Sequence, residues 1–337
     1  MTGIRDIARK AGVSPGTVSR VLNNDPTMSV SQSTRERILA VVAETGYDLS
    51  SRKYAKKTLP SLLVISTVTQ EPANQDLYFT ELQKGMAEEA RRLHLGMNRL
   101  YHLADAPKKW QDFDKVGAII VIGTVEDEEL TRLRQLNENL IVVDKSSLPN
   151  IDADLVCSNF EEVTRQILQH FYQTGCRRIA YIGGYTQDMT ESGHSSQSEA
   201  EKRLTSYRAF LQEHDLPEIS FLGNWDETAG ATLTKKLLES DWRPDALLFG
   251  SDHLAIGGYP LLTKHFVIGK ELMVASFDDL PLVAKLQPSL TSVQIPSREM
   301  GKAAVRLARE KIYQERLASC VLTFPGTLIF RDSFRIK

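Results

Sequence analysis

Short hydroxyl side chains and one arginine lie close together near the N-terminus. Ser14 and Thr17 are suited to hydrogen bonds with phosphate oxygens of DNA. Arg20 carries a planar guanidinium that can donate two hydrogen bonds to one guanine base. This spacing predicts a surface that contacts DNA, and an ordinary three-helix domain with the same periodicity is the alternative.

Polar side chains also follow three apolar runs farther along the chain. Asp144, Ser251 and Asp278 each come directly after such a run. Ligands of open α/β sheets bind outside the carboxyl ends of the strands, so we expect these side chains to meet in one cleft. Arg203, at the start of a predicted helix, faces the same cleft. Carboxylates accept hydrogen bonds from vicinal hydroxyls and arginine donates to ring oxygens, so the set suits a sugar.

Each of these residues also has a structural interpretation. Asp144 and Asp278 could cap strand ends or form ion pairs with Arg203. Asp252 is predicted to be the N-cap of a helix rather than a ligand-binding residue. An anionic ligand would need more cations than Arg203 supplies, so the residues favour a neutral polyol over a phosphosugar or a purine.

The DNA-contacting side chains need a helical frame, which the first residues provide. Apolar spacing predicts helices at Ile4–Ala11 and Pro15–Leu22, with Gly12 ending the first and Ser14 capping the second. A third helix is predicted from Ser31 or Ser33 to about Thr45, with a buried face formed by Ile38, Leu39, Val42 and in part Val41. This is the plan of a helix-turn-helix domain, whose second helix enters the major groove.

From residue 61 onward, short apolar runs alternate with helical patterns. Strands are predicted at 62–66, 118–122, 140–144, 179–183, 246–249 and 272–277, and helices at 82–93, 163–174, 199–214, 228–240 and 297–316. Strands that alternate with helices imply parallel sheets covered on both faces. We expect an N-terminal all-α helix-turn-helix domain followed by an α/β domain of two doubly wound lobes. The polar stretch 186–198 is expected to be a mobile loop.

Charge and composition agree with a nucleic-acid module attached to a larger body. The first 58 of the 337 residues contain ten Lys or Arg and five Asp or Glu, a net charge of +5, whereas the remainder carries −7. No apolar run approaches the roughly 20 residues that span a bilayer, and no secretory signal is recognisable. Three widely spaced cysteines favour reduced thiols in a cytoplasmic protein.

The amino-acid sequence of the first two predicted helices resembles that of a known protein family. The stretch from Ile4 to Asn23, IRDIARKAGVSPGTVSRVLN, resembles the N-terminal signature of the lac repressor/galactose repressor (LacI/GalR) family. The match continues at Val30-Ser31, Thr34-Arg35-Glu36 and Gly46-Tyr47. The resemblance implies that Thr17 and Ser19 lie at phosphates and that positions 15, 16 and 20 read bases.

Two of the base-reading positions carry unusual residues. Neither Pro15 nor Gly16 has a side chain that can hydrogen-bond a base, so Arg20 is expected to carry much of the direct readout. The DNA-binding residues predicted in the head are Ser14, Pro15, Gly16, Thr17, Ser19, Arg20 and Asn23.

A polar and basic linker, residues 48–60, follows the head. In the family this segment is a hinge helix that folds in the dimer on operator DNA and wedges a leucine into a central minor-groove step. The letters SRKYA at 51–55 resemble that helix, but no leucine stands at the wedge position. Tyr54 is the nearest apolar candidate for this DNA contact, and a solvated tether is the alternative.

The body resembles the same family, in which it looks like a periplasmic sugar-binding protein whose two lobes close on a ligand. Matching segments lie at 175–184, 203–207, 251–257, 276–279, 287–291 and 328–333. Ser206 stands where the family pattern has glycine, and Ser251 where asparagine is common. The resemblance implies that Trp225 packs against the sugar ring, with an ordinary core position as the alternative. The predicted ligand-binding residues are Tyr78, Phe79, Asp144, Arg203, Trp225, Ser251 and Asp278.

These features predict a homodimeric repressor of a sugar-utilisation operon that binds pseudo-palindromic double-stranded operator DNA. A small sugar of the galactose or β-galactoside type would relieve repression. The alternatives are a co-repressed or phosphoprotein-dependent catabolite regulator of the same family, and a sugar-binding transport protein. The expected boundaries are 1–47 for the head, 48–60 for the hinge and 61–337 for the ligand-binding and dimerisation domain.

Catalytic and metal motifs are missing from the sequence. The seven histidines show no paired ligand spacing, and neither a nucleophile elbow nor a phosphate-binding loop occurs. A Ser–His pair at His194 and Ser195 lies in a polar stretch and is set aside. We therefore expect no enzymatic activity, no metal, no membrane contact and no cofactor other than the sugar effector.

Overall fold

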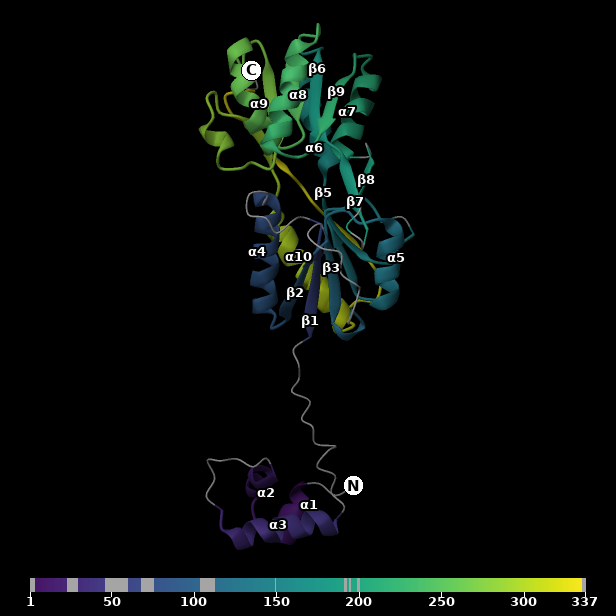
Figure 1. The fold of residues 1–337 in the computed structure, drawn as a ribbon, viewed down its shortest axis with the longest axis vertical. Coiled ribbons are helices and arrows are strands. Elements are labelled where there is room, and N and C mark those ends of the chain that lie inside the picture. The colour runs from purple at the N-terminus through teal and green to yellow at the C-terminus, as the bar shows by residue number, and fades with distance from the viewer. Residues whose placement is uncertain are drawn as a thin grey trace. The chain divides into compact units, whose positions relative to one another are not determined.

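The computed structural model describes residues 4–22, 30–45, 60–67, 76–103, 113–148, 150–190, 193, 195–198 and 201–334. The chain divides into two compact units, Met1–Thr58 and Leu59–Lys337 (Figure 1). Each unit has its own hydrophobic core.

The small unit consists of helices α1 (Ile4–Ala11), α2 (Pro15–Leu22) and α3 (Gln32–Glu44). The first two have the predicted bounds, because Gly12 adopts a φ of +64° after α1 and Ser14 caps α2. Ser31 accepts a hydrogen bond from the Thr34 amide at the start of α3. The apolar faces meet in a cluster formed by Ile7, Ala8, Ala11, Val18, Val21, Ile38, Val41 and Val42.

The prediction that Leu39 is buried is wrong. Its side chain is 46% exposed, whereas Val41 and Val42 point into the core. One turn of α3 therefore presents an apolar residue outward, since positions 38, 41 and 42 already complete the inward face.

The large unit begins with a first lobe built on a six-stranded parallel sheet in the order β13-β5-β4-β3-β1-β2. The strands are β1 (Ser61–Ser66), β2 (Gly96–His102), β3 (Ala118–Ile122), β4 (Leu140–Val143), β5 (Asp154–Ser158) and β13 (Val321–Phe324). Its helices are α4 (Leu77–Arg92), α5 (Asp127–Leu136) and α10 (Ser297–Ile312), with a short 3-10 turn at Phe113–Lys115. Strands β3 and β4 are buried throughout, which is why they read as continuous apolar runs.

The second lobe repeats this plan in a sheet with the order β14-β12-β11-β10-β6-β9. The strands are β6 (Ile179–Gly184), β9 (Ile219–Gly223), β10 (Ala246–Phe249), β11 (Met273–Phe277), β12 (Thr291–Gln294) and β14 (Thr327–Ile329), of which β14 alone pairs antiparallel in this sheet. Its helices are α6 (Phe160–Gln173), α7 (Lys202–Glu213), α8 (Glu227–Glu239) and α9 (Asp252–His265), with a 3-10 turn at Val283–Lys285. Strands β7 (Thr186–Met189) and β8 (Ser195–Ser198) form a separate antiparallel hairpin.

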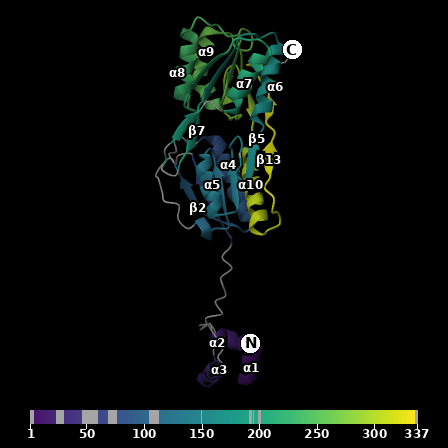
Figure 2. The same cartoon turned by 90° about the vertical axis from the view of Figure 1, so that its right-hand side faces the viewer.

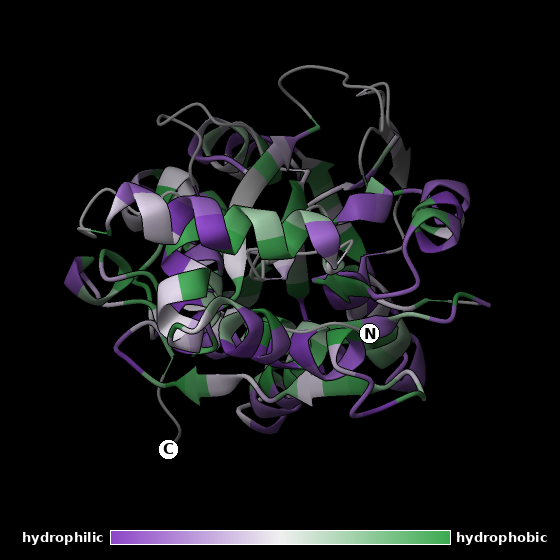
Figure 3. Ribbon diagram, turned by 90° about the horizontal axis from the view of Figure 1, so that it is seen from below, coloured by the Kyte–Doolittle hydropathy of each residue, from purple (hydrophilic) through white to green (hydrophobic). Residues whose placement is uncertain are grey.

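The main chain passes between the lobes three times. It leaves the first lobe between β5 and α6, returns between β12 and α10, and leaves again between β13 and β14. The central strands of both sheets are hydrophobic, and the helices beside them carry hydrophilic residues on their outer surfaces (Figure 3). The expected two-lobed architecture is therefore observed, and it places the carboxyl ends of the parallel strands of both lobes at the junction between them.

Several local predictions differ from the structure. The stretch 186–198 contains β7 and β8 and is not wholly a loop. For helix α9 the sequence predicts only an N-cap and no further bounds, because its glycines and Pro260 are poor helix formers. Helix α10 ends at Ile312 and does not reach residue 316. Within the described residues, no helix is long and apolar enough to cross a membrane.

Candidate DNA-binding and effector sites

The exposed face of α2 carries most of the side chains predicted to contact DNA. Ser14 accepts a hydrogen bond from the Thr17 amide at 3.1 Å, and the hydroxyls of these residues lie 2.8 Å apart. Pro15, Gly16 and Arg20 are exposed, and Ser19 is half-buried. Val18 and Val21 fix the opposite face in the core. Helix α2 thus presents its N-terminal turn and one free guanidinium outward, as a recognition helix must.

Two residues predicted to contact DNA, Asn23 and Tyr54, lie outside the described residues. The predicted hinge, residues 48–60, also lies outside the described residues, apart from Pro60. Ser14 also has a structural role as the N-cap of α2, so its hydroxyl is engaged before any phosphate approaches.

In the large unit, Tyr78 and Asp144 meet at the carboxyl end of the first-lobe sheet. The Tyr78 hydroxyl donates a hydrogen bond to Asp144 Oδ1 at 2.9 Å. Asp144 directly follows β4 and has a φ of +67°, which turns its side chain away from the strand direction. Burial raises the pKa of Asp144 to about 6, although the bond from Tyr78 and the charge of Arg203 oppose this rise.

Asp278 occupies the corresponding position after β11 in the second lobe, with a φ of +101°. Burial is the main cause that raises the pKa of its carboxyl, and the charges of Asp76 and Asp252 add to it. Asp278 also raises the pKa of Tyr78 through its charge, and Tyr78 is the residue that donates a hydrogen bond to Asp144. The two predicted acids thus face one region between the lobes.

Arg203 lies at the start of α7 and is held from several sides. Its Nε donates to Glu201 Oε1 at 2.8 Å, and its Nη1 donates to the carbonyl of Gly250 at 2.6 Å. The guanidinium carbon lies 4.5 Å from the ring centroid of Phe160 and 4.6 Å from that of Trp225. Burial opposes its charge, but Glu201 keeps the pKa of Arg203 above its ordinary value. The ion pair is therefore with Glu201, and the structure records none with Asp144 or Asp278.

Trp225 lies across the ends of β6 and β10. A Cβ atom at Gly184 would collide with its indole ring, and one at Gly250 would come within 2.9 Å of Cζ3. The indole Nε1 donates to the carbonyl of Tyr185 at 2.9 Å. The ring packs partly against the second-lobe core and is half-buried. Glycine at both strand ends thus lets a flat aromatic surface reach the junction between the lobes.

The remaining two predicted ligand residues are placed differently. Ser251 is buried, and its hydroxyl accepts a hydrogen bond from the Leu254 amide at 3.4 Å as the N-cap of α9. Phe79 is partly buried and packs edge-on against Tyr78, with ring centroids 5.0 Å apart. Both therefore have structural roles beside the junction.

The N-cap prediction for Asp252 is wrong, because Ser251 is the cap. The Asp252 carboxylate is fully buried and accepts hydrogen bonds from the hydroxyls of Ser276 and Ser292. It also accepts one from the Leu280 amide at 2.7 Å. Asp252 thus joins α9 to β11, β12 and the turn that follows Asp278, which is a structural role as expected.

Sequence reasoning missed several residues at the junction. His253 lies between the lobes, with Nε2 at 3.6 Å from Asp76 Oδ1 and Nδ1 at 3.6 Å from Glu227 Oε1. Glu201 holds Arg203, and Phe160 stacks on it. Asp76 has a recognisable signal as an N-cap residue before α4, whereas His253 follows Ser251-Asp252 without any signature of its own.

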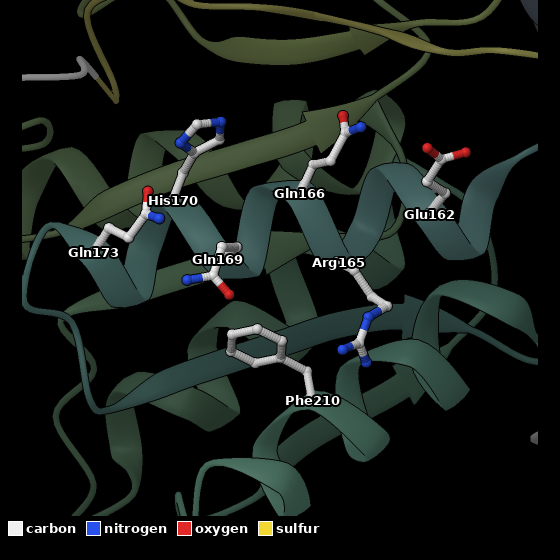
Figure 4. Close-up of a pocket in the computed structure, with 7 residues that line it drawn as sticks. All are labelled: Glu162, Arg165, Gln166, Gln169, His170, Gln173 and Phe210. Carbon is white, nitrogen blue, oxygen red and sulfur yellow. The ribbon is translucent and has the colours of Figure 1, made fainter.

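A surface pocket lies elsewhere in the second lobe. Figure 4 shows polar side chains along one face of α6, with Phe210 of α7 beside them. It is lined by Glu162, Arg165, Gln166, Gln169, His170, Gln173 and Phe210. None of the predicted ligand residues lines it. Among the described residues, no group of three or more His, Cys, Asp or Glu side chains could hold a metal ion.

A helix-turn-helix unit attached to a two-lobed α/β unit defines the class of ligand-responsive DNA-binding regulators. Residues 3–49 match the model of the bacterial regulatory proteins of the lacI family, and residues 168–334 match a periplasmic binding protein-like domain. The chain is 31% identical to the transcriptional repressor MelR of Bacillus subtilis, covering 99% of this chain and 97% of MelR. The chain belongs to the LacI/GalR family.

Other relatives and solved structures agree with this assignment. The transcriptional regulator GalR of Streptococcus thermophilus is 30% identical, with 99% of each chain covered. The lac repressor dimer bound to operator and an anti-inducer has a TM-score of 0.70 at 21% identity, covering 98% of both chains. The regulator CelR in complex with cellobiose has a TM-score of 0.67 at 20% identity, covering 99% of this chain and all of that chain.

Family membership confirms several predictions. The protein is a transcriptional repressor with the expected fold class, and it is not an enzyme. Operator DNA, a small sugar effector and a second copy of the chain are partners of repressors of this family, and they are the partners expected from the sequence. The identity of the sugar and the residues that contact it go beyond family membership.

Proposed function

We propose that the protein represses a sugar-utilisation operon and releases its operator when a small sugar of the galactose or β-galactoside type binds between the lobes. The observation that carries this proposal is the juxtaposition of Asp144, Asp278, Arg203 and Trp225 at one junction. Two acids accept from hydroxyls, one arginine donates, and an indole covers the C–H face of a pyranose. Tyr78, Phe79 and Ser251 complete the proposed effector site.

The named relatives favour this sugar class without fixing it. Two of them are called GalR, and a third, from Lactobacillus helveticus, is called LacR at 27% identity. Catabolite control protein A of Priestia megaterium, at 26% identity, supports the alternative of a catabolite regulator. A neutral sugar agrees with the single cation, Arg203, among the proposed effector residues.

On the DNA side, we propose that α2 and the residues next to it in sequence contact one half-site, through Ser14, Pro15, Gly16, Thr17, Ser19, Arg20 and Asn23. Tyr54 would contact the centre of the operator. A dimer binds two half-sites, so the operator is expected to be pseudo-palindromic. The boundaries 1–47, 48–60 and 61–337 remain predictions, as does a cytoplasmic location, which access to chromosomal DNA requires.

Fluorescence anisotropy of a labelled pseudo-palindromic duplex from the gene's own upstream region tests the function. The full chain is titrated at fixed salt with and without galactose, lactose, allolactose and melibiose, because affinity for DNA depends steeply on salt. We expect specific binding that one sugar weakens. Binding that no sugar changes would refute the induction proposal and favour a co-repressed regulator. Absence of specific binding to the duplex would refute the proposal that the protein recognises this operator.

A further inference from the structure

The β7–β8 hairpin starts in the second lobe but binds the first lobe. The Met189 amide donates a hydrogen bond to the Thr124 carbonyl at 3.0 Å, and the Glu126 amide donates to the Met189 carbonyl at 3.1 Å. Met189 thus forms a parallel bridge with Val125, beyond the carboxyl end of β3. Figures 1 and 2 place β7 beside the junction of the lobes. This is a strand-like contact between lobes, made far from the three chain crossings in sequence.

Side chains strengthen the same contact. Met189 is only 7% exposed and belongs to the first-lobe apolar cluster that includes Val125 and Leu130. The Thr124 hydroxyl donates to the Gln187 carbonyl at 2.6 Å. A methionine from one lobe therefore fills a space in the core of the other, and burying such a side chain stabilises by about 1.5–3 kcal/mol.

A buried lysine adds an electrostatic link. Lys145 Nζ lies 3.5 Å from Asp188 Oδ1 of β7 and 3.2 Å from Asp127 Oδ1 of α5, with the lysine side chain 10% exposed. It also donates to the Val125 carbonyl at 2.9 Å. Lys145 consequently holds the hairpin and the start of α5 together.

The two ends of segment 185–189 contact Trp225 of the proposed effector site and Lys145, which is next to Asp144 of that site. At one end, the Tyr185 carbonyl accepts the hydrogen bond from the Trp225 indole. At the other end, the segment contacts Lys145, the residue after Asp144. The segment therefore connects Trp225, in the second lobe, to Lys145, the sequence neighbour of Asp144 in the first lobe.

We propose that segment 185–189 is an interlobe clasp, which holds the lobes together before any effector binds and sets the separation of Trp225 and Asp144. The clasp itself does not depend on the identity of the effector, whereas its influence on affinity rests on the proposed sugar site. A ligand that needs both lobes binds only the fraction of molecules with the lobes together, so the clasp raises apparent affinity. Met189 and Lys145 are positioning residues in this arrangement.

Distance measurements between spin labels on the two lobes test the clasp without a ligand. The labels replace the exposed Gln135 of α5 and Gln212 of α7, in full-length protein carrying Cys157→Ser and Cys320→Ser. Chains that carry both spin labels are diluted with unlabelled protein, so that each labelled dimer carries one pair of labels. Met189→Asp should lengthen and broaden the distance distribution, because a carboxylate cannot stay in an apolar core. Gln187→Ala is the matched control, since only the carbonyl of Gln187 makes the contact.

A second variant covers the case in which Met189→Asp does not fold. Lys145→Ala removes the ion pair with Asp188 and should also broaden the distribution. If Met189→Asp folds, wild-type distances in both variants would overturn the clasp. If it does not fold, wild-type distances in Lys145→Ala alone would overturn it.

The effect on effector binding is measured with the sugar that releases DNA in the anisotropy experiment. Sugar affinity of Met189→Asp should fall about 5- to 150-fold relative to Gln187→Ala, the usual range for coupling between sites. An open distance distribution with unchanged sugar affinity would overturn the link to the effector site. If no sugar binds the wild type, the proposed function fails while the distance experiment still decides the clasp.

Discussion

His253 of α9 lies between two carboxylates, and one of them belongs to the opposite lobe. Its Nε2 is 3.6 Å from Asp76 Oδ1 at the start of α4, and its Nδ1 is 3.6 Å from Glu227 Oε1 of α8. Asp76 is the largest cause that raises the pKa of His253 to about 9, and Asp278 and Glu227 contribute through their charges. The imidazolium is therefore an ionic contact between the lobes at neutral pH.

This contact is expected to make a pH-dependent contribution to the free energy of unfolding. The substitution His253→Gln should remove that contribution. The folded protein favours the charged ring, so its contribution is full below the unfolded pKa of 6.5 and is lost as the pH rises through 9. The expected loss at pH 6 is roughly 2 kcal/mol, given about 1.4 kcal/mol per pKa unit and partial solvent screening. Denaturant unfolding at pH 6 and pH 10 measures it, with the exposed His265→Gln on the same helix as control. Equal destabilisation at both pH values would contradict the ionic role.

The bond between Tyr78 and Asp144 predicts a pH dependence of sugar binding. The pKa of Asp144 is about 6, and the hydrogen bond from Tyr78 holds it below the value that burial alone would give. Tyr78→Phe should raise the pKa of Asp144 further and shift the pH midpoint of sugar affinity upward. Calorimetry between pH 5 and pH 8 measures this midpoint. A midpoint that does not move would show that Asp144 does not govern sugar affinity.

Local sequence patterns predict the elements whose structure is set locally. Helices α1 and α2 have the predicted bounds because a glycine turn and a serine cap define their ends. Strands β3 and β10 also match, since buried parallel strands are short continuous apolar runs. In contrast, α9 carries Gly257, Gly258 and Pro260, which are poor helix formers, and it is helical in contact with α8 and with the β10 residue Phe249, which approach these glycines closely.

Contacts between distant segments explain the rest of what was missed at the site. Tyr78 and Asp144 were both predicted to be ligand residues, but the hydrogen bond between them was not predicted. His253, Glu201 and the Met189 clasp have no local signature, because each acts through a partner on another element. Strand-end position identifies which acids face the junction, whereas the partners of those acids are set by the packing of the two lobes.

Arg20 is expected to carry sequence discrimination in the DNA-binding head. Its side chain is exposed on α2, whereas Pro15 and Gly16 offer no side-chain hydrogen bond. Arg20→Ala should cost about 1–3 kcal/mol of discrimination at one base pair of each half-site. Arg20→Lys is the matched control, because it keeps the charge but loses the two-pronged contact to guanine. Anisotropy with single-base variants of the operator measures both, and unchanged discrimination in Arg20→Ala would assign the readout to another residue.

Gly250 is predicted to position Trp225 and Arg203 for the effector. A Cβ atom there would come within 2.8 Å of the Tyr181 hydroxyl and 2.9 Å of Trp225 Cζ3, and the Gly250 carbonyl accepts the bond from Arg203. Gly250→Ala should therefore shift the indole and weaken sugar binding about tenfold or more, while DNA affinity without sugar stays unchanged, because the head folds on its own core. Tryptophan fluorescence during a sugar titration measures the affinity for sugar. The variant Trp225→Phe identifies the part of the fluorescence signal that comes from Trp225. If Gly250→Ala binds sugar as the wild type does, Trp225 is an ordinary core residue and not part of the effector site.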